Sequence, residues 1–407
     1  MIAHIAWRNV WRNKLRSLVV ISAIALGLWG GIFSYAFMQG MGEQQVYSGI
    51  HTETGHIQLN EPKFLQNYDL QRHIEQSERV EEQIRQLPGV KGVCDRIELT
   101  AMTSTAYASR GIMLNGIDPQ IYNGVSDLHE YLTEGNFFEV DNGGVNPIVI
   151  GQALAEKLHT DLSSRLVVTL QDYRGEISYA SFKLVGIYRL HNTEFNEQMA
   201  FVRKQDLQKI LRLPKGYVST VSVLLDDTKQ TKVIQGQIAK LFPNLQVQSW
   251  DELSPMLRMM SGTMTQMSLI FVFIILLALA FGIINTMLMA VMDRTREIGM
   301  LLSVGMNQKK IFTMIVLETL FLSLTGALAG LLMSIATVNY LGTSGVNLTA
   351  IAEGINALGY SERVYPQLDP GFAPQFAVMV IMIALLSSLF PAMRAIHLKP
   401  AEAVRGE

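Results

Sequence analysis

SLVVISAIALGLWGGIFSYAFMQGMG, residues 17–42, contains no charged side chain. A helix needs about 20 predominantly apolar residues to cross the hydrocarbon layer of a membrane. Leu18 to Met38 meets that requirement, so residues 17–42 are predicted to form a membrane-spanning helix. Only 17% of the 407 residues are charged, well below the roughly 25% of an ordinary soluble domain, which supports the same interpretation.

Three further apolar runs of sufficient length lie in the last third of the chain. All are free of charge except the middle one, which contains Glu318. The runs predict spanning helices over residues 259–292, 311–341 and 371–393. Charges crowd instead into residues 43–258. The predicted fold class is therefore membrane α-helical, with four transmembrane helices and a large α+β extracytoplasmic domain inserted between helices 1 and 2.

The distribution of Lys and Arg predicts the orientation of the spans, because these residues are retained on the cytoplasmic side. Residues 1–16, 293–310 and 394–407 are rich in them, whereas the loop 342–370 contains only Arg363. Both termini are therefore expected in the cytoplasm. A cleaved signal peptide is the alternative for the first span, with Ser34-Tyr35-Ala36 as the cleavage site, but the apolar run exceeds the usual 7–15 residues.

Residues 43–258 alternate strand-like runs with amphipathic helices, which is typical of an α+β fold. Helices are predicted over Arg72–Leu87, stopped by Pro88-Gly89, and over Thr231–Phe242. Residues 121–214 are interpreted as an inserted subdomain. Strands are predicted at Ile148–Ile150, Leu166–Leu170, Ser181–Tyr188, Ala200–Val202 and Val221–Leu225.

The sequence contains no pattern typical of an enzyme or a metal site. It has no phosphate-binding loop, and His129-Glu130 lacks the second histidine of a zinc motif. We expect neither a cofactor nor a bound metal. The net charge of −2 argues against nucleic acid as a partner. The single cysteine, Cys94, cannot form an intrachain disulfide and is expected to be a small buried side chain.

The N-terminal segment is predicted to be an interfacial helix that leads into the first span. Trp7, Trp11 and Leu15 recur at every fourth residue and so share one helical face. Indole rings favour the headgroup level of a membrane, and arginines stay near phosphate, so membrane lipid is the expected partner. The alternative is simple anchoring by positive charge. The neighbouring basic face comprises Arg8, Arg12 and Arg16.

The connection between the second and third spans reads MDRTREIGMLLSVGMNQKK, residues 292–310. A short helix here would place Ile298, Leu301 and Leu302 on one side. Arg294 and Glu297, three residues apart, are predicted to pair on its surface. Gly305 is predicted to end the helix in a left-handed cap. Such a rod suits docking to a partner on the cytoplasmic side, and a solvated connector is the alternative.

Two features inside the spans are candidates for function or packing. Glu318 is an ionisable group within a membrane helix, which marks it as a functional candidate, or as the partner of Lys309 or Lys310 at the interface. Small residues four apart allow close approach of helix backbones. Such pairs occur at Gly27/Gly31, Ala278/Gly282 and Gly326/Gly330, and any of them could form a dimer face.

The motif RTREIG at residues 294–299, with Gly305, Lys309-Lys310 and Glu318 after it, resembles the signature of the FtsX/MacB family of ABC transporter permeases. The C-terminal PAMRA at 391–395 and KPAEAVR at 399–405 are similar to the closing motif of that family. VIGQALA at 149–155 and FKLVGIY at 182–188 resemble its periplasmic core domain. The likeness covers nearly the whole chain. One departure is MLLS at 300–303, where the family often has Leu-Arg-Ala.

The resemblance implies a permease in the bacterial inner membrane that hydrolyses no ATP itself. A separate ABC ATPase subunit would receive the rod at residues 293–304 as a coupling helix, and a second permease copy or a paralogue would complete a dimer. Motion of the extracytoplasmic domain, or mechanotransmission, would do the work. The residues assigned to ATPase coupling are Arg294, Arg296, Glu297, Ile298, Gly299, Leu301, Leu302 and Gly305.

Length and plan most resemble the lipoprotein-releasing LolC/LolE type, which implies a lipoprotein substrate or a periplasmic partner. Two alternatives stay open. A stand-alone MacB-like efflux permease has the same plan, and a regulator of an extracytoplasmic cell-wall hydrolase would need the same coupling helix.

Overall fold

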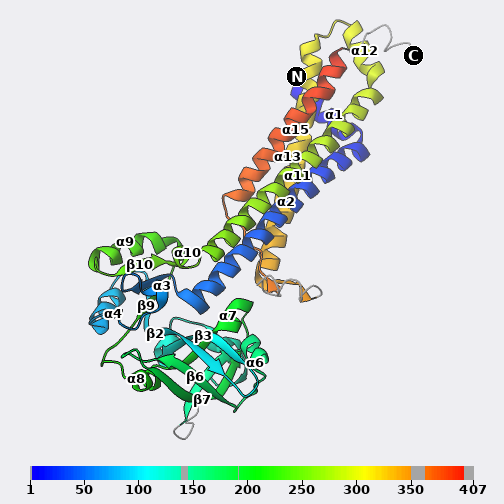
Figure 1. The fold of residues 1–407 in the computed structure, drawn as a ribbon. Helices are drawn as coiled ribbons and strands as arrows, with labels where there is room; N and C mark the ends of the chain where they lie inside the picture. The colour runs from blue at the N-terminus through cyan, green and yellow to red at the C-terminus, as the bar shows by residue number, and fades with distance from the viewer. Residues whose placement is uncertain (1, 139–144, 191, 350–362, 398–407) are drawn as a thin grey trace. The chain divides into compact units, whose positions relative to one another are not determined.

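The structure is a computed structural model that describes residues 2–138, 145–190, 192–349 and 363–397. The chain divides into two compact units (Figure 1). One is a helical bundle built from the residues up to Glu43, Ser261–Thr349 and the residues from Arg363 onward. The other is an α+β domain formed by Gln44–Met260.

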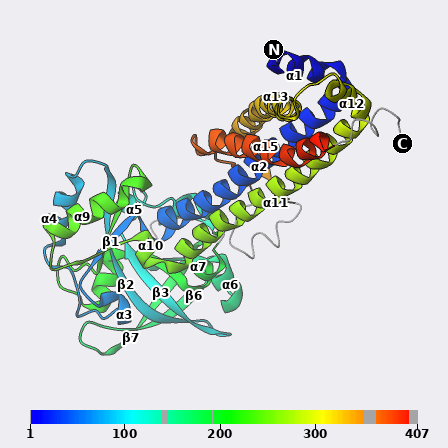
Figure 2. The ribbon, with the colours of Figure 1, turned by 90° about the horizontal axis from the view of Figure 1, so that it is seen from above.

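Four helices in the described residues are long and apolar enough to cross a membrane, and they run side by side (Figures 1 and 2). Because the α+β domain lies between the first and second of them, the predicted fold class is confirmed. The first three helices extend a few residues beyond their predicted spans at both ends, whereas α15 begins one residue late and extends only at its C-terminal end. The helices are α2 (Lys14–Gly49), α11 (Pro255–Asp293), α13 (Gln308–Ser344) and α15 (Phe372–Ile396).

Glycines let the bundle helices pack closely. A methyl group on Gly31 of α2 would lie 2.2 Å from Cε1 of Phe376 in α15, and one on Gly326 of α13 would lie 2.8 Å from Cβ of Ile24. Both neighbours are fully buried. These two predicted small-residue pairs therefore serve packing within the chain. Gly282, by contrast, has no atom within 4 Å of its would-be Cβ among the described residues.

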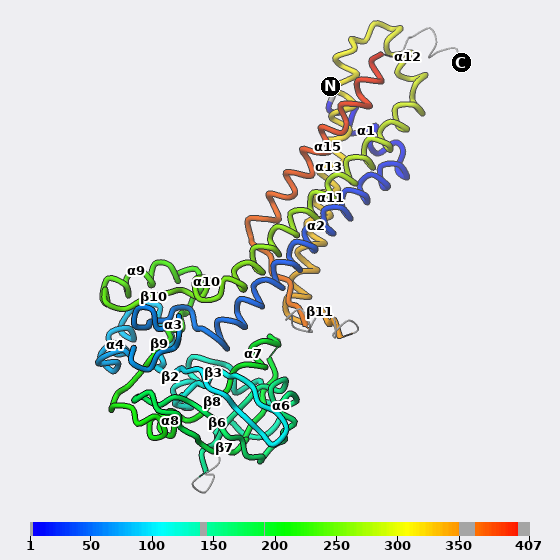
Figure 3. Tube along the Cα trace, in the orientation of Figure 1, coloured from blue at the N-terminus to red at the C-terminus, as the bar shows by residue number. Residues whose placement is uncertain are grey.

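The N-terminal helix α1 (Ile2–Arg12) ends before the first span begins (Figure 2). Asn13 separates the two helices, and its side-chain oxygen accepts a hydrogen bond from the backbone N–H of Arg16 at 3.5 Å. The prediction of one continuous face through Leu15 and Arg16 is therefore wrong, because both residues belong to α2. The connection between α13 and α15 contains a short ladder of β11 (Val346–Asn347) and β12 (Arg363–Val364) (Figure 3). Residues 350–362 of the predicted loop 342–370 lie outside the described residues.

The α+β domain is built on one ten-stranded sheet in the described residues. The five predicted strand segments lie within β5–β9 and are confirmed. Strands β1–β4 and β10 had not been predicted. The strands are β1 (Ile57–Asn60), β2 (Val90–Ser104), β3 (Ser109–Ile117), β4 (Leu132–Gly135), β5 (Asn146–Gly151), β6 (Arg165–Gln171), β7 (Ile177–Tyr188), β8 (Met199–Arg203), β9 (Thr220–Leu225) and β10 (Gln246–Ser249).

Strand β2 belongs to two parts of this sheet. Its first half, Val90–Arg96, pairs with β9, which continues to β1 and β10. Its last residues, Met102–Ser104, pair with β6. Six strands thereby close a ring in the order β2, β3, β8, β5, β7 and β6. Residues 121–214, interpreted as an inserted subdomain, supply β4–β8 to this sheet.

Separate apolar clusters support the ring and the open part of the sheet. Leu114, Leu166 and Phe182 belong to the cluster of the ring, whereas Val80 and Ile234 belong to the cluster of the open part. Cys94 is buried as predicted, and burial raises the pKa of its thiol to about 12. The helices of the domain are α3 (Phe64–Asn67), α4 (Ser77–Arg85), α5 (Pro119–Tyr122), α6 (Gln152–Leu158), α7 (Thr193–Gln198), α8 (Lys204–Leu211), α9 (Thr231–Leu241) and α10 (Trp250–Leu253).

Helix α9 confirms one helix prediction, and α4 corrects the other. Residues before Ser77 had been predicted as helical, but Ile74 donates its backbone N–H to Val218 O at 2.8 Å instead. Gln76 then adopts a left-handed backbone conformation with φ of 51°. The segment is thus drawn toward the sheet, and the helix begins only after this turn.

Candidate functional site at the connection of α11 and α13

A short helix, α12 (Thr295–Ser303), joins α11 to α13. It ends as predicted, because Gly305 has φ of +94°, a conformation that side chains rarely tolerate. Gly305 donates its N–H to Leu302 O and Met306 donates to Leu301 O, both at 3.0 Å. These paired bonds form a Schellman motif, which satisfies the last carbonyl groups of the helix.

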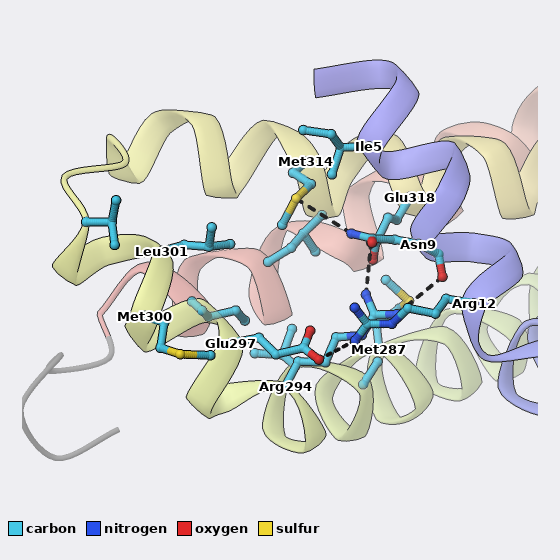
Figure 4. A pocket seen from close by; sticks show the side chains of 15 residues that line it. Ile5, Asn9, Arg12, Met287, Arg294, Glu297, Met300, Leu301, Met314 and Glu318 are labelled. Carbon is cyan, nitrogen blue, oxygen red and sulfur yellow. Dashed lines mark hydrogen bonds and ion pairs between the residues drawn. The ribbon is translucent and has the colours of Figure 1, made fainter. Parts of the chain in front are cut away.

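A cavity of about 460 Å³ lies between α1, the end of α11, α12 and the start of α13 (Figure 4). Its lining is mainly apolar, with two acid–base pairs among the side chains. The residues that line it are Ile5, Asn9, Arg12, Met287, Ala290, Val291, Arg294, Glu297, Ile298, Met300, Leu301, Val304, Met314, Ile315 and Glu318.

The first pair is buried. Nη1 of Arg294 donates to Oε1 of Glu318 at 3.0 Å, and the two side chains are only 12% and 6% exposed. Nη2 of Arg294 also donates to the backbone oxygen of Asn9 in α1 at 3.3 Å. One guanidinium therefore connects the beginning of α12 to both α13 and α1.

This geometry corrects two predictions. Arg294 does not pair with Glu297, because it precedes the first turn of α12 and extends toward α13 instead. Glu318 does not pair with Lys309 or Lys310, which are exposed at the start of α13. Both expected pairs were chosen for their short sequence separation, whereas the observed partner comes from a different helix.

The second pair links α1 to α12. Arg12 and Glu297 form an ion pair in which the side chains are 56% and 46% exposed (Figure 4). An exposed pair of this kind contributes about 0–1 kcal/mol to stability, since water screens it. The pair connects α1 to α12 beside the cavity, which both side chains line.

Helix α12 has a packed side and an exposed side. Ile298 and Gly299 are buried, and Leu302 packs against the apolar core of the bundle. Leu301 was predicted on the same side but is 36% exposed and lines the cavity. The exposed side comprises Arg296, Met300 and the C-cap residue Val304, which is 89% exposed; Met300 and Val304 also line the rim of the cavity.

The aromatic residues of α1 lie on a different side from its cavity-lining residues. Trp7 packs edge-on against Phe321 of α13, with ring centroids 5.4 Å apart, and against Trp11 at 5.9 Å. Both indoles are partly exposed, and Arg8 is exposed beside them. Arg16 lies beyond the break at Asn13, at the start of α2.

Sequence reasoning did not find the contribution of α1 to this cavity. Ile5, Asn9 and Arg12 recur at spacings of four and three residues, which places them on one helical face. Asn9 also donates from Nδ2 to Sδ of Met314 at 3.8 Å. This spacing could have predicted a second contact face on α1. The sequence interpretation considered only the face that contains the regularly spaced tryptophans.

The C-terminal closing motif lies only partly within the described residues. Residues 391–395 lie in α15, where Ala392 and Ala395 are fully buried. The end of α15 is tied to α13 because Nε2 of Gln308 donates to Ile396 O at 3.2 Å. Residues 399–405, the rest of the motif, lie outside the described residues.

Comparison with known proteins identifies the family. The family model for the MacB-like periplasmic core domain matches residues 17–241, more than half of the chain. The model for the C-terminal part of FtsX-like permeases matches residues 269–400, which include α12 and its flanking helices.

Curated relatives align over almost the entire length. LolE of the lipoprotein-releasing system of Haemophilus influenzae is 23% identical, over 98% of this chain and 97% of that protein. LolC of the same system from Neisseria meningitidis serogroup B is also 23% identical, over 96% and 94%. YknZ of Bacillus subtilis, an uncharacterized ABC transporter permease, is 24% identical over 99% and 98%. The chain therefore belongs to the FtsX-like ABC transporter permeases that carry a MacB-like periplasmic core domain.

Proposed function

We propose that the chain is the permease subunit that couples ATP hydrolysis in a separate ATPase subunit to motion of its α+β domain. The observation that carries the proposal is the two-sided character of α12. One side is held to α1 and α13 by two ion pairs, and the other exposes Arg296, Met300 and Val304.

The exposed side of α12 has the chemistry of a docking surface. Methionine and arginine are enriched at protein interfaces, and exposed apolar side chains gain free energy when a partner covers them. A partner that pushes on α12 would move the start of α13 through the Arg294–Glu318 pair and α1 through the Arg12–Glu297 pair. The four residues form the mechanical link in this proposal.

We also propose an orientation of the chain in the membrane. The basic residues at both termini and in the α11–α13 connection support a position of these segments on the cytoplasmic side of the inner membrane. The α+β domain then lies on the opposite side. A second permease copy or a paralogue completes the assembly, and the exposed Ala278/Gly282 pair of α11 is available for that contact.

Lipoproteins released from the inner membrane are the proposed substrate. The support is the near full-length similarity to LolE and LolC, whose names describe a lipoprotein-releasing system. Photo-crosslinkers placed at the exposed positions Leu26 of α2 and Leu277 of α11 test this proposal. Capture of acylated lipoprotein supports it, whereas capture of only small amphiphiles, or of a cell-wall hydrolase by the α+β domain, contradicts it.

Substitution of the exposed side of α12 tests the coupling. Val304→Asp together with Met300→Asp should abolish co-purification of the ATPase subunit and leave the amount of membrane-inserted permease unchanged. Val233→Asp is the matched control, because Val233 is 64% exposed on α9 in the α+β domain. Normal ATPase association in the double variant would show that α12 is not the coupling element.

A further inference from the structure

The α+β domain contains a second cavity, of about 340 Å³, at the point where α2 and α11 enter it. Its walls come from the last turns of α2, the π-helical turn Ile50–Thr54, the helix α7 and the first turns of α11. The residues of all four walls belong to the single compact unit Gln44–Met260.

Two glutamates line this cavity. Glu53 is largely buried, and its Oε1 accepts a hydrogen bond of 2.6 Å from Nδ2 of Asn192. Asn192 is itself fixed, because its Oδ1 accepts from the backbone N–H of Phe195 at the start of α7 at 3.2 Å. Glu194 lies on the exposed rim. Among the described residues, no lysine, arginine or histidine lines the cavity.

The lining also contains a hydrogen-bond acceptor that receives no hydrogen bond within the described part of the chain. Oε1 of Gln45 is buried and has no partner among the described residues, while Nε2 of the same side chain donates to Sδ of Met260 at 3.3 Å. A buried acceptor without a donor costs free energy that a bound donor can recover. Burial raises the pKa of Glu53 to about 7, so its carboxyl group is only partly ionised at neutral pH when the cavity is empty. A protonated amine would favour the ionised form of Glu53 and would also supply the donor that Oε1 of Gln45 lacks.

Other residues of the lining are apolar. Phe195 and Leu257 are buried, and Met256 and Met260 lie beside Leu257 in α11. Methionine side chains adapt to ligands of irregular shape. No cluster of three or more metal-ligating His, Cys, Asp or Glu side chains occurs among the described residues, which favours an organic cation over a metal ion.

We propose that this cavity binds a molecule that carries a protonated amine next to an apolar chain. The ammonium group donates to Glu53 and to Oε1 of Gln45, and the chain packs against Leu257 and Met260. The site shares no residue with the cavity at α12.

Calorimetric titration of the full-length protein in lipid nanodiscs tests the proposal, with empty nanodiscs as the blank. n-Hexylamine, protonated at pH 7, should bind at least tenfold more tightly than n-hexanol, which has the same chain without the charge. Hexyltrimethylammonium, which has the charge but no N–H donor, should bind several-fold more weakly than hexylamine. Equal affinity of the wild-type protein for hexylamine and either of the other two compounds would overturn the proposal.

Substitutions of the lining residues test whether the amine binds in this cavity. Glu53→Gln should remove the tenfold preference for the amine, whereas Glu156→Gln, a change at an exposed glutamate of α6, should preserve it. Gln45→Leu retains the carboxyl group of Glu53 and should weaken hexylamine binding several-fold. Unchanged hexylamine affinity in both Glu53→Gln and Gln45→Leu would place binding elsewhere and refute the assignment. None of these measurements requires the ATPase, so their failure would not bear on the coupling role of α12.

Discussion

The guanidinium of Arg294 lies 3.0 Å from the carboxylate of Glu318, although 24 residues separate them in the chain. Removal of one member of a buried ion pair leaves a charge without a partner, at a cost of about 3–5 kcal/mol. We therefore expect Glu318→Ala to destabilise the protein by that amount. Unfolding in sodium dodecyl sulfate titrations measures the change. Arg296→Ala, at an exposed position of α12, should shift stability by no more than about 0.5 kcal/mol.

Replacement of both Arg294 and Glu318 should destabilise the protein much less than replacement of either one alone. Arg294→Met combined with Glu318→Leu buries no charge, so we expect most of the stability lost in either single variant to return. If the double variant loses the sum of the two single effects, the residues do not act as a pair. ATPase association should nevertheless fall in the double variant, since the link between α12 and α13 is gone.

The Arg12–Glu297 pair should affect coupling more than stability. Because both side chains are about half exposed, Arg12→Glu is expected to cost no more than about 1 kcal/mol in the same unfolding assay. It should reduce permease-stimulated ATP hydrolysis, because α1 is no longer held to α12. Exchange of the charges, Arg12→Glu with Glu297→Arg, should restore stimulation. Failure of the exchange to restore it would exclude a role for the pair in force transfer.

Two adjacent glycines in α2 should respond differently to alanine. A Cβ at Gly31 would lie 2.2 Å from the buried ring of Phe376, so Gly31→Ala is expected to cost about 1–3 kcal/mol through overpacking. Gly30 has nothing within 4 Å among the described residues, and Gly30→Ala should be neutral or stabilise the helix by up to about 1 kcal/mol. Thermal melting in detergent micelles compares them. Addition of Phe376→Leu should rescue Gly31→Ala, and equal effects of both alanines would contradict the packing described for α2 and α15.

Stability of the α+β domain should depend on pH through Glu81 of α4. Burial, and then repulsion by Asp95, raise the pKa of Glu81 from 4.5 to about 7, although Arg85 and Lys204 oppose the shift. The folded protein thus holds this proton more tightly than the unfolded chain. Between about pH 4.5 and 7 the unfolded state binds fewer protons, so this group makes stability fall as pH rises.

The contribution of Glu81 is measured as the difference in melting temperature between the wild type and Glu81→Gln across that pH range. A difference is required because burial lowers the pKa of His56 to about 4, which makes stability change in the opposite direction over an overlapping range. We expect the advantage of Glu81→Gln to grow toward pH 7. Glu82→Gln, at the exposed neighbouring position, should show no such trend. A constant difference for Glu81→Gln would contradict the raised pKa.

The spanning helices were predictable because membrane thickness fixes their length, whatever their neighbours are. Strands β5 to β9 were predictable because short runs of Val, Ile and Leu favour strands. Strand β2 was missed because it contains Arg96 and Glu98, which resemble exposed positions in sequence. In the fold these two side chains are buried and neutralise each other at 2.6 Å. Their pairing also depends on sheet contacts that the sequence does not reveal.

At the candidate site, too, the sequence predicted local structure but not the contacts between distant segments. The position of α12 and its glycine cap followed from local chemistry, since Gly305 supplies a conformation that other residues resist. The partners of Arg294 and Glu297 did not follow, because each lies on another helix. The part played by α1 emerged only when the bundle brought Asn9 and Arg12 beside α12.

Strand β2 is hydrogen-bonded to β9 over one half and to β6 near its end, and pairs with β3 along its second half. Because one continuous strand belongs to both the closed ring and the open sheet, bending between these two parts would have to bend β2 and strain its hydrogen bonds to β9 and β3. We therefore expect the α+β domain to move as one rigid body, without a hinge between the closed ring and the open part of the sheet.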